Sequence, residues 1–178
     1  RVVASNSPRR SNGLPKSSIN PRSNYGFEAV ELSDDGIGYL KFNMFSSSPS
    51  AFKIAEDMLK QIEDAKAIIF DLRDNIGGSP RMIEFISSYL FDKPTQLNVF
   101  FDRDANQVGE SRTFRDIPGK RFANDIPVFV VTSSQTFSAA EEFTYNLQSF
   151  DRATIVGETS GGGAHPIQIH TVSELFRI

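Results

Sequence analysis

A serine at the start of an apolar helical pattern is the first residue whose type and place could do chemistry. Within the segment TSSQTFSAAE, Ser138 is followed three residues later by Glu141. This spacing is a capping box, which requires no catalytic role. The same place suits a nucleophile, because the helix dipole and the Ala139 N–H would stabilise negative charge that develops beside the serine. The pattern alone leaves both interpretations open.

Two glycine-rich loops could act beside this serine. The loop DLRDNIGG ends in Gly77 and Gly78, whose backbone N–H groups could bind a carbonyl oxygen that becomes an oxyanion, although a tight turn also explains such a pair. The loop GETSGGGAHP contains His165. It lacks the Gly-Lys-Ser/Thr of a phosphate-binding loop, so no nucleotide site is predicted. Taken alone, His165 is more typical of a packed or surface histidine than of a base.

Alternating strands and helices must position these three loops. An Asp-Gly turn at 35–36 predicts a hairpin between the first two strands, and residues 102–126 read as a long polar excursion with one hairpin. The predicted strands are 27–32, 37–42, 67–72, 96–101, 127–132, 154–157 and one from 167; the predicted helices are 50–65, 81–91 and 138–149. The order predicts an α/β fold with a mixed, mostly parallel sheet flanked by helices. Because all three loops follow strands, we expect them at the carboxyl edge of that sheet.

Composition limits the class of protein. The 178 residues, of which 39% are apolar and 23% charged, suit one folded domain. No apolar run approaches the ~20 residues of a membrane span, and a net charge of −3 argues against nucleic-acid binding. With no cysteine and two histidines, neither a metal nor an organic cofactor is expected. Residues 1–24 are rich in Ser, Asn and Pro and read as a flexible linker or partial N-terminal segment, which leaves 25–178 as the core domain.

Together the motifs are more specific than any one of them. They lie in AIIFDLRDNIGG, VFVVTSSQTFSAAEEFTYNLQ and RATIVGETSGGGAHP, with NYGFEAVEL and GIGYLKFNMF upstream of them. Through these segments the chain resembles the S41 peptidase family over residues 24–170. That family includes tail-specific (carboxyl-terminal processing) proteases, tricorn-like proteases and the interphotoreceptor retinoid-binding protein repeats, and the chain looks most like the bacterial members of the last branch. The resemblance implies a ClpP/crotonase-like ββα core and a serine peptidase acting on peptides or proteins. Ser138 matches the nucleophile, Ala139 one oxyanion N–H donor, and Gly77 or Gly78 the other.

The chain departs from this family at the general base. Processing proteases carry a lysine where this chain has Gly163, and no lysine follows Lys120, so a Ser–Lys dyad is not expected. The tricorn-like branch uses an upstream histidine, and none precedes Ser138. We therefore predict a core that is truncated at its C-terminal end and lacks its base. The alternative base is His165, which would share a face with residue 163 in an extended segment.

Two other functions remain open from the sequence. A non-catalytic ligand-binding or scaffolding module would match the retinoid-binding repeats. Crotonase-type thioester chemistry uses a similar oxyanion geometry, but the motif TFSAAE argues against it. The absence of cysteine and the resemblance favour a periplasmic or exported bacterial protein. The sequence predicts no oligomeric state.

Overall fold

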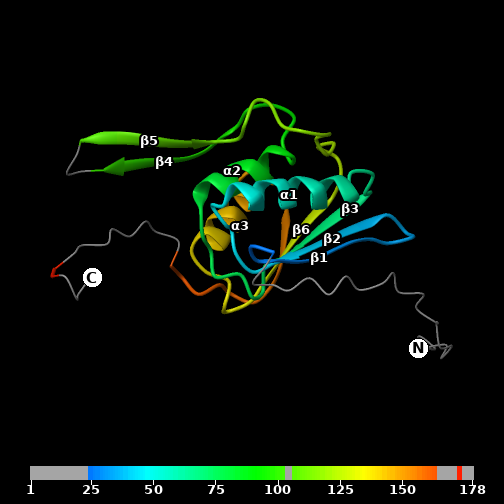
Figure 1. Cartoon of the computed structure of the whole chain (residues 1–178), viewed down its shortest axis with the longest axis horizontal. Helices are drawn as coiled ribbons and strands as arrows, with labels where there is room; N and C mark the ends of the chain where they lie inside the picture. The colour runs from blue at the N-terminus through cyan, green and yellow to red at the C-terminus, as the bar shows by residue number, and fades with distance from the viewer. Residues whose placement is uncertain (1–23, 103–105, 164–171, 174–178) are drawn as a thin grey trace.

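A five-stranded sheet forms the centre of the fold. The computed structural model describes residues 24–102, 106–163 and 172–173. The strand order is β1-β2-β3-β6-β7; β1 pairs antiparallel with β2, and the remaining neighbours pair in parallel (Figure 1). The strands are β1 (Phe27–Leu32), β2 (Ile37–Phe42), β3 (Ala67–Asp71), β6 (Val128–Thr132) and β7 (Thr154–Gly157). The predicted mixed, mostly parallel sheet is confirmed. Residues 1–23 of the predicted linker 1–24 and the predicted strand from 167 lie outside the described residues.

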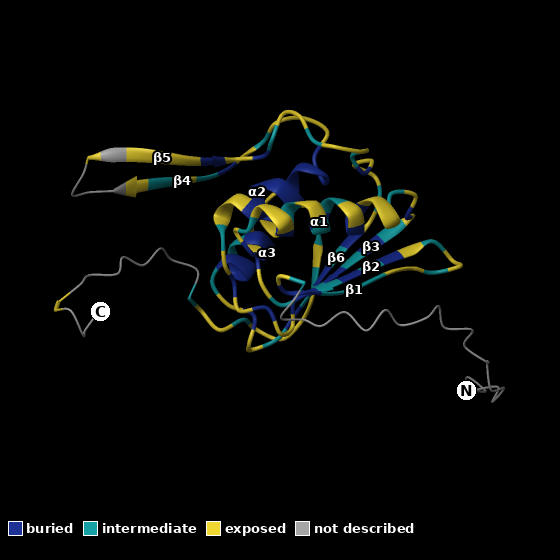
Figure 2. Ribbon diagram, viewed as in Figure 1, coloured by how far each residue is buried: buried dark blue, intermediate teal, exposed yellow. Residues whose placement is uncertain are grey.

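Three helices pack against this sheet. They are α1 (Pro49–Gln61), α2 (Pro80–Ser88) and α3 (Ala139–Ser149). Burial alternates along β2 and β6, and Figure 2 shows buried residues in the strands and in the helices that lie against them. Among the described residues, the sheet therefore has one covered face, and β3 lies at its centre between β2 and β6.

Two helix ends differ from the prediction. Helix α1 ends at Gln61 instead of residue 65, although Ile62 and Ala65 remain fully buried as its pattern requires. The turn closed by Ala65 N–H and Ile62 C=O (2.9 Å) carries the chain into β3. Helix α2 ends at Ser88 instead of residue 91. Apolar periodicity predicts which residues are buried better than it predicts where the helical hydrogen bonds stop.

Phenylalanine side chains connect the sheet to α3. Phe143 of α3 contacts Phe45 and Phe70, with ring centroids 5.5 and 5.4 Å apart. Phe45 also contacts Phe42 at the end of β2, with centroids 4.9 Å apart. These four rings are fully buried. Because α3 begins immediately after Ser138, this packing fixes the position of that serine relative to the sheet.

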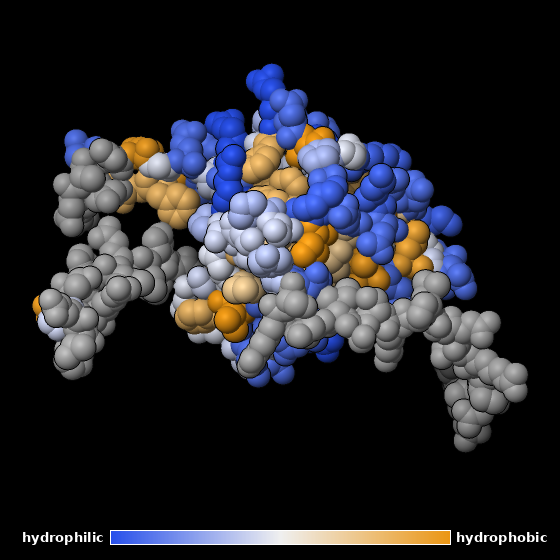
Figure 3. Space-filling view, in the orientation of Figure 1, coloured by the Kyte–Doolittle hydropathy of each residue, from blue (hydrophilic) through white to orange (hydrophobic). Residues whose placement is uncertain are grey.

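A two-stranded ribbon projects from the body of the domain (Figure 1). It consists of β4 (Gln96–Asp102) and β5 (Gln107–Arg112), which pair antiparallel. The predicted strand 96–101 therefore exists, and its partner is the hairpin expected within 102–126. Apolar surface is visible on the ribbon in Figure 3, where Val99, Phe101 and Val108 are exposed. None of the described helices is long and apolar enough to cross a bilayer.

Candidate active site

The three predicted loops lie together at the carboxyl edge of the sheet. Phe137 N–H donates to Asn75 C=O (2.9 Å), which joins the loop after β3 to the loop after β6. Gly161 N–H donates to Thr136 C=O (2.9 Å), which joins the loop after β7 to the same segment. The rule that working loops follow the carboxyl ends of parallel strands therefore predicted this cluster correctly.

Ser138 lies in a strained turn between β6 and α3. Its backbone angles are φ 55° and ψ −121°, a region that an L-residue occupies at a cost of about 1–3 kcal/mol. Glu141 holds the turn from both directions: its Oε2 accepts from Ser138 N–H (2.7 Å), and its own N–H donates to Ser138 C=O (2.9 Å). A sharp strand-to-helix turn of this kind presents a serine hydroxyl at the edge of a sheet. The capping contact and the strained turn thus occur together.

Gly77 and Gly78 are required by close backbone contacts. Both have positive φ, 98° and 137°. A Cβ atom on Gly77 would lie 2.6 Å from Ser138 Cβ and 2.8 Å from Ala139 N. A Cβ atom on Gly78 would lie 2.2 Å from Phe45 C=O. The first glycine therefore lies directly against the serine, and no larger residue fits at either position without displacing the backbone.

The two glycines differ in what their N–H groups do. Gly77 N–H donates to Asn75 Oδ1 (2.9 Å). Gly78 forms a parallel bridge with Phe45. In this bridge Phe45 N–H donates to Gly77 C=O and Ser79 N–H donates to Phe45 C=O, so the bridge leaves Gly78 N–H free. Within the described part of the chain, neither Gly78 N–H nor Ala139 N–H donates a hydrogen bond. Two unpaired backbone donors thus accompany Ser138.

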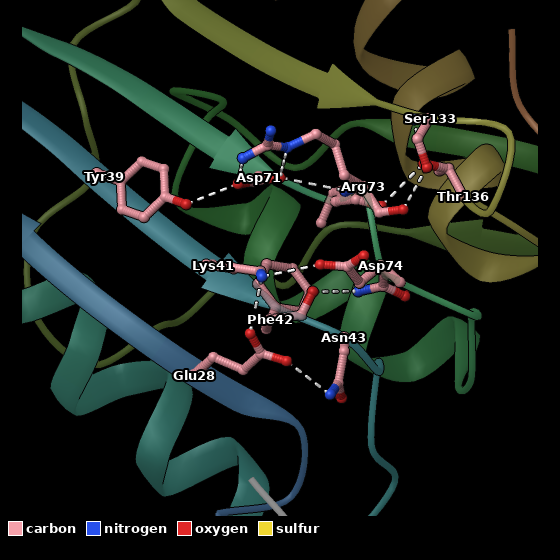
Figure 4. Close-up of polar contacts among 12 residues, drawn as sticks. Glu28, Tyr39, Lys41, Phe42, Asn43, Asp71, Arg73, Asp74, Ser133 and Thr136 are labelled. Carbon is pink, nitrogen blue, oxygen red and sulfur yellow. Dashed lines mark hydrogen bonds and ion pairs between the residues drawn. The ribbon is translucent and has the colours of Figure 1, made fainter. Parts of the chain in front are cut away.

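An ionic cluster around the buried Asp71 anchors the start of the glycine loop (Figure 4). The carboxylate of Asp71 accepts from Tyr39 OH (2.6 Å) and from Arg73 Nε and Nη2 (2.9 and 2.6 Å). Burial alone would raise the pKa of Asp71, but the hydrogen bonds from Arg73 and Tyr39 lower it to about 2. Burial and the neighbouring Asp71 raise the pKa of Tyr39 to about 12. The loop therefore begins from a fixed, charged anchor at neutral pH.

Lys41 braces the same loop and is unsuited to act as a base. Its Nζ lies 2.8 Å from an Asp74 carboxylate oxygen and 3.0 Å from a Glu28 oxygen (Figure 4). Hydrogen bonds to Asp74 and Glu28 raise the pKa of Lys41. A lysine general base needs the opposite shift, toward neutral pH. Lys41 therefore remains a cation that ties β1 and β2 to the glycine loop.

Glu141 also holds the third loop. Its carboxylate accepts from Ser160 Oγ (2.7 Å), Gly162 N–H (2.6 Å) and Gly163 N–H (2.8 Å), in addition to Ser138 N–H. Burial opposes ionisation, but these four hydrogen bonds outweigh it and lower the pKa of Glu141. One buried carboxylate thus connects the serine turn to the loop after β7.

The ring of Phe137 explains the glycines of this loop. A Cβ atom on Gly161 would lie 2.8 Å from Phe137 Cδ2, and one on Gly163 would lie 2.0 Å from Phe137 Cζ. By the sequence resemblance, Gly163 matches the position of the lysine in the processing proteases. A side chain at residue 163 would therefore meet the Phe137 ring beside the serine, and the ring would have to turn aside to admit it.

His165, the alternative base, lies outside the described residues. Residues 24–102 and 106–163 contain no histidine. Across the described residues no group of three or more His, Asp or Glu side chains could hold a metal ion. The structure thus brings together Ser138, Ala139, Gly77 and Gly78 and does not show what would accept the serine proton.

Sequence reasoning missed several residues of this site. It left unnamed the roles of Asn75, of Phe137 and of the Tyr39–Asp71–Arg73 cluster. The charged run DLRD directly after an apolar strand was the available signal, since charges next to a buried strand need partners.

A serine on a strand-to-helix turn beside unpaired backbone N–H groups is an arrangement typical of serine hydrolases. The chain belongs to peptidase family S41, whose model matches residues 36–175. It is 30% identical over 141 residues to the carboxyl-terminal-processing protease of Synechocystis sp., which covers 75% of this chain and 31% of that protein. It is 32% identical over 145 residues to the chloroplastic carboxyl-terminal-processing peptidase 2 of Arabidopsis thaliana, covering 78% of this chain and 25% of that one.

Solved structures support the fold. A candidate S41 protease from Bacteroides fragilis superposes with a TM-score of 0.66 at 20% identity, covering 85% of this chain and 43% of the other. That likeness concerns the fold alone. The chain thus spans between a quarter and a third of the length of the two processing proteases it matches.

Proposed function

We propose that this chain carries the nucleophile and oxyanion hole of an S41 serine endopeptidase. Ser138 Oγ attacks the carbonyl carbon of a peptide bond and passes its proton to a general base. The oxyanion of the tetrahedral intermediate accepts hydrogen bonds from Ala139 N–H and from the Gly77–Gly78 loop. Collapse of the intermediate releases the amine, which takes the proton, and water then hydrolyses the acyl-serine. The observation that carries the proposal is the strained Ser138 turn packed against Gly77 with two unpaired N–H donors beside it.

The general base belongs to the proposal as well. Lys41 is held as a cation, Gly163 replaces the family's lysine, and Phe137 fills the space beside it. We therefore assign the base either to His165 or to a group of the whole protein outside these residues. An intact-mass measurement of fluorophosphonate labelling with His165→Ala separates the two. Unchanged labelling in that variant excludes His165.

The proposal also includes the substrate class and the compartment. A peptide or protein substrate fits the carboxyl-terminal-processing proteases that the chain resembles. We also propose a periplasmic or exported location in a bacterium, which the cysteine-free composition supports.

The test is serine-specific labelling and hydrolysis. Incubation with a fluorophosphonate should add one label, detected by intact mass, and Ser138→Ala should abolish both the label and peptide hydrolysis. The matched control is Ser134→Ala, because Ser134 is an exposed serine of the same loop and should behave as wild type. Full hydrolysis in Ser138→Ala would overturn the proposal. Tight binding of an apolar ligand without serine reactivity would instead favour the binding module.

A further inference from the structure

Asn75 is a buried polar residue at the junction of three segments. Its side chain is fully buried. Its Nδ2 donates to Phe42 C=O at the end of β2 (2.9 Å), and its Oδ1 accepts from Gly77 N–H (2.9 Å). Its backbone C=O accepts from Phe137 N–H (2.9 Å). Asn75 thus connects β2, the glycine loop and the turn that carries Ser138.

These contacts orient the peptide between Gly77 and Gly78. The C=O of Gly77 accepts from Phe45 N–H (2.8 Å). In a planar trans peptide, the N–H of the next residue points opposite to that C=O. Gly78 N–H therefore points away from Phe45, and Gly77 N–H is already paired with Asn75. Of the two glycines, Gly78 is therefore the one whose N–H is unpaired within the described residues.

Two glycines in sequence would not hold this arrangement unaided. Glycine backbones rotate more freely than those of any other residue, so the Gly77–Gly78 peptide needs external contacts to keep one orientation. The Asn75 side chain supplies one of them on Gly77 and is itself anchored on Phe42. A buried amide with both ends bonded is a rigid support, because breaking either bond leaves an unpaired polar group.

We propose that Asn75 is the positioning residue of the oxyanion hole, and that it selects Gly78 N–H as the donor which acts with Ala139 N–H. The inference rests on the proposed peptidase function. It concerns the side chain of Asn75 alone, since the backbone bond to Phe137 survives substitution. Removing one oxyanion donor typically lowers kcat by about 10²–10³-fold. Asn75→Ala should therefore lower kcat by about 10²-fold and leave KM nearly unchanged.

Asn75→Asp gives a pH-dependent version of the same test. When protonated, the introduced carboxyl group can donate to Phe42 C=O and accept from Gly77 N–H, as the amide does. When ionised, it places a negative charge against Phe42 C=O, and burial raises its pKa. The ratio of variant to wild-type kcat should be highest at acidic pH and fall as pH rises through that pKa. A role limited to packing would leave the ratio flat wherever circular dichroism shows both proteins folded.

Asn146→Ala is the matched control. Asn146 is also a buried asparagine, on α3, and its Nδ2 has no partner within the described residues. Its loss should lower stability without changing kcat. Wild-type kcat in Asn75→Ala, in a protein whose Ser138→Ala variant is inactive, would overturn the inference and leave the proposed function standing.

Amide hydrogen exchange provides a readout that does not need activity. The Gly77 amide should be protected in the wild type and exchange faster in Asn75→Ala, while the Gly78 amide should be unprotected in both. An unprotected Gly77 amide in the wild type would overturn the assignment. If Ser138→Ala retains full hydrolysis, the proposed function fails. The exchange result still decides whether the Asn75 side chain pairs with the Gly77 amide and leaves the Gly78 amide free.

Discussion

Replacing Gly77 by alanine should damage both stability and serine reactivity. Gly77 has a φ of 98°, and holding an L-residue in left-handed backbone costs about 1–2 kcal/mol. The added methyl would lie 2.6 Å from Ser138 Cβ and 2.8 Å from Ala139 N. Forcing an atom into packed space adds about 1–3 kcal/mol. The sum is a loss of about 2–5 kcal/mol in the free energy of unfolding.

Gly119 provides the control for the backbone term. It also has positive φ (78°), and a Cβ atom there would meet nothing within 4 Å. Gly119→Ala should therefore lose only the backbone term of about 1–2 kcal/mol. Urea unfolding followed by circular dichroism measures both variants. Fluorophosphonate labelling should slow at least about tenfold in Gly77→Ala alone, because the methyl displaces the oxyanion donors. Equal destabilisation of the two variants would refute the close approach of Gly77 to Ser138.

Three further predictions concern charge and packing around the site. Glu141→Gln should lower the free energy of unfolding by about 1–3 kcal/mol, since a buried acceptor of four hydrogen bonds loses its charge. Glu142→Gln should be neutral or stabilising, because burial raises the pKa of Glu142. Urea midpoints that rank the two variants the other way would contradict this prediction. Asp71 has a pKa of about 2 against an ordinary 3.8. Its contribution of about 2 kcal/mol to the free energy of unfolding is therefore present above about pH 4 and lost as pH falls toward 2. The difference in stability between wild type and Asp71→Asn should close over that range, and a constant difference would refute the prediction. Gly163→Lys should not raise hydrolysis and should destabilise the chain only slightly, because the exposed Phe137 ring must turn aside. Phe137→Ala should remove that cost in a double-mutant cycle, whereas additive effects would exclude the clash.

Sequence patterns predicted the architecture well because they report local and periodic requirements. The alternating apolar residues of β2, the Asp-Gly turn after β1 and the helical spacing in α1 each need only nearby residues to be interpreted. The gathering of three loops at one edge followed from strand direction in a parallel sheet. The ends of α1 and α2 were less accurate, since the last helical turn depends on how the chain leaves toward the next element.

Ser138, Ala139 and the glycine pair could be named from the sequence because their residue types and order carry the signal. Sequence alone could not decide which glycine keeps a free N–H, since that depends on Asn75 and Phe45, which reach the loop from different directions. The same holds for Glu141. Its spacing from Ser138 predicted the helix cap, but it could not predict the hydrogen bonds that Glu141 accepts from Ser160, Gly162 and Gly163. These contacts join residues far apart in the chain, and only the packed sheet brings them within hydrogen-bond distance. Residue types thus determined which chemistry is available, and tertiary structure decided which atoms are left free to perform it.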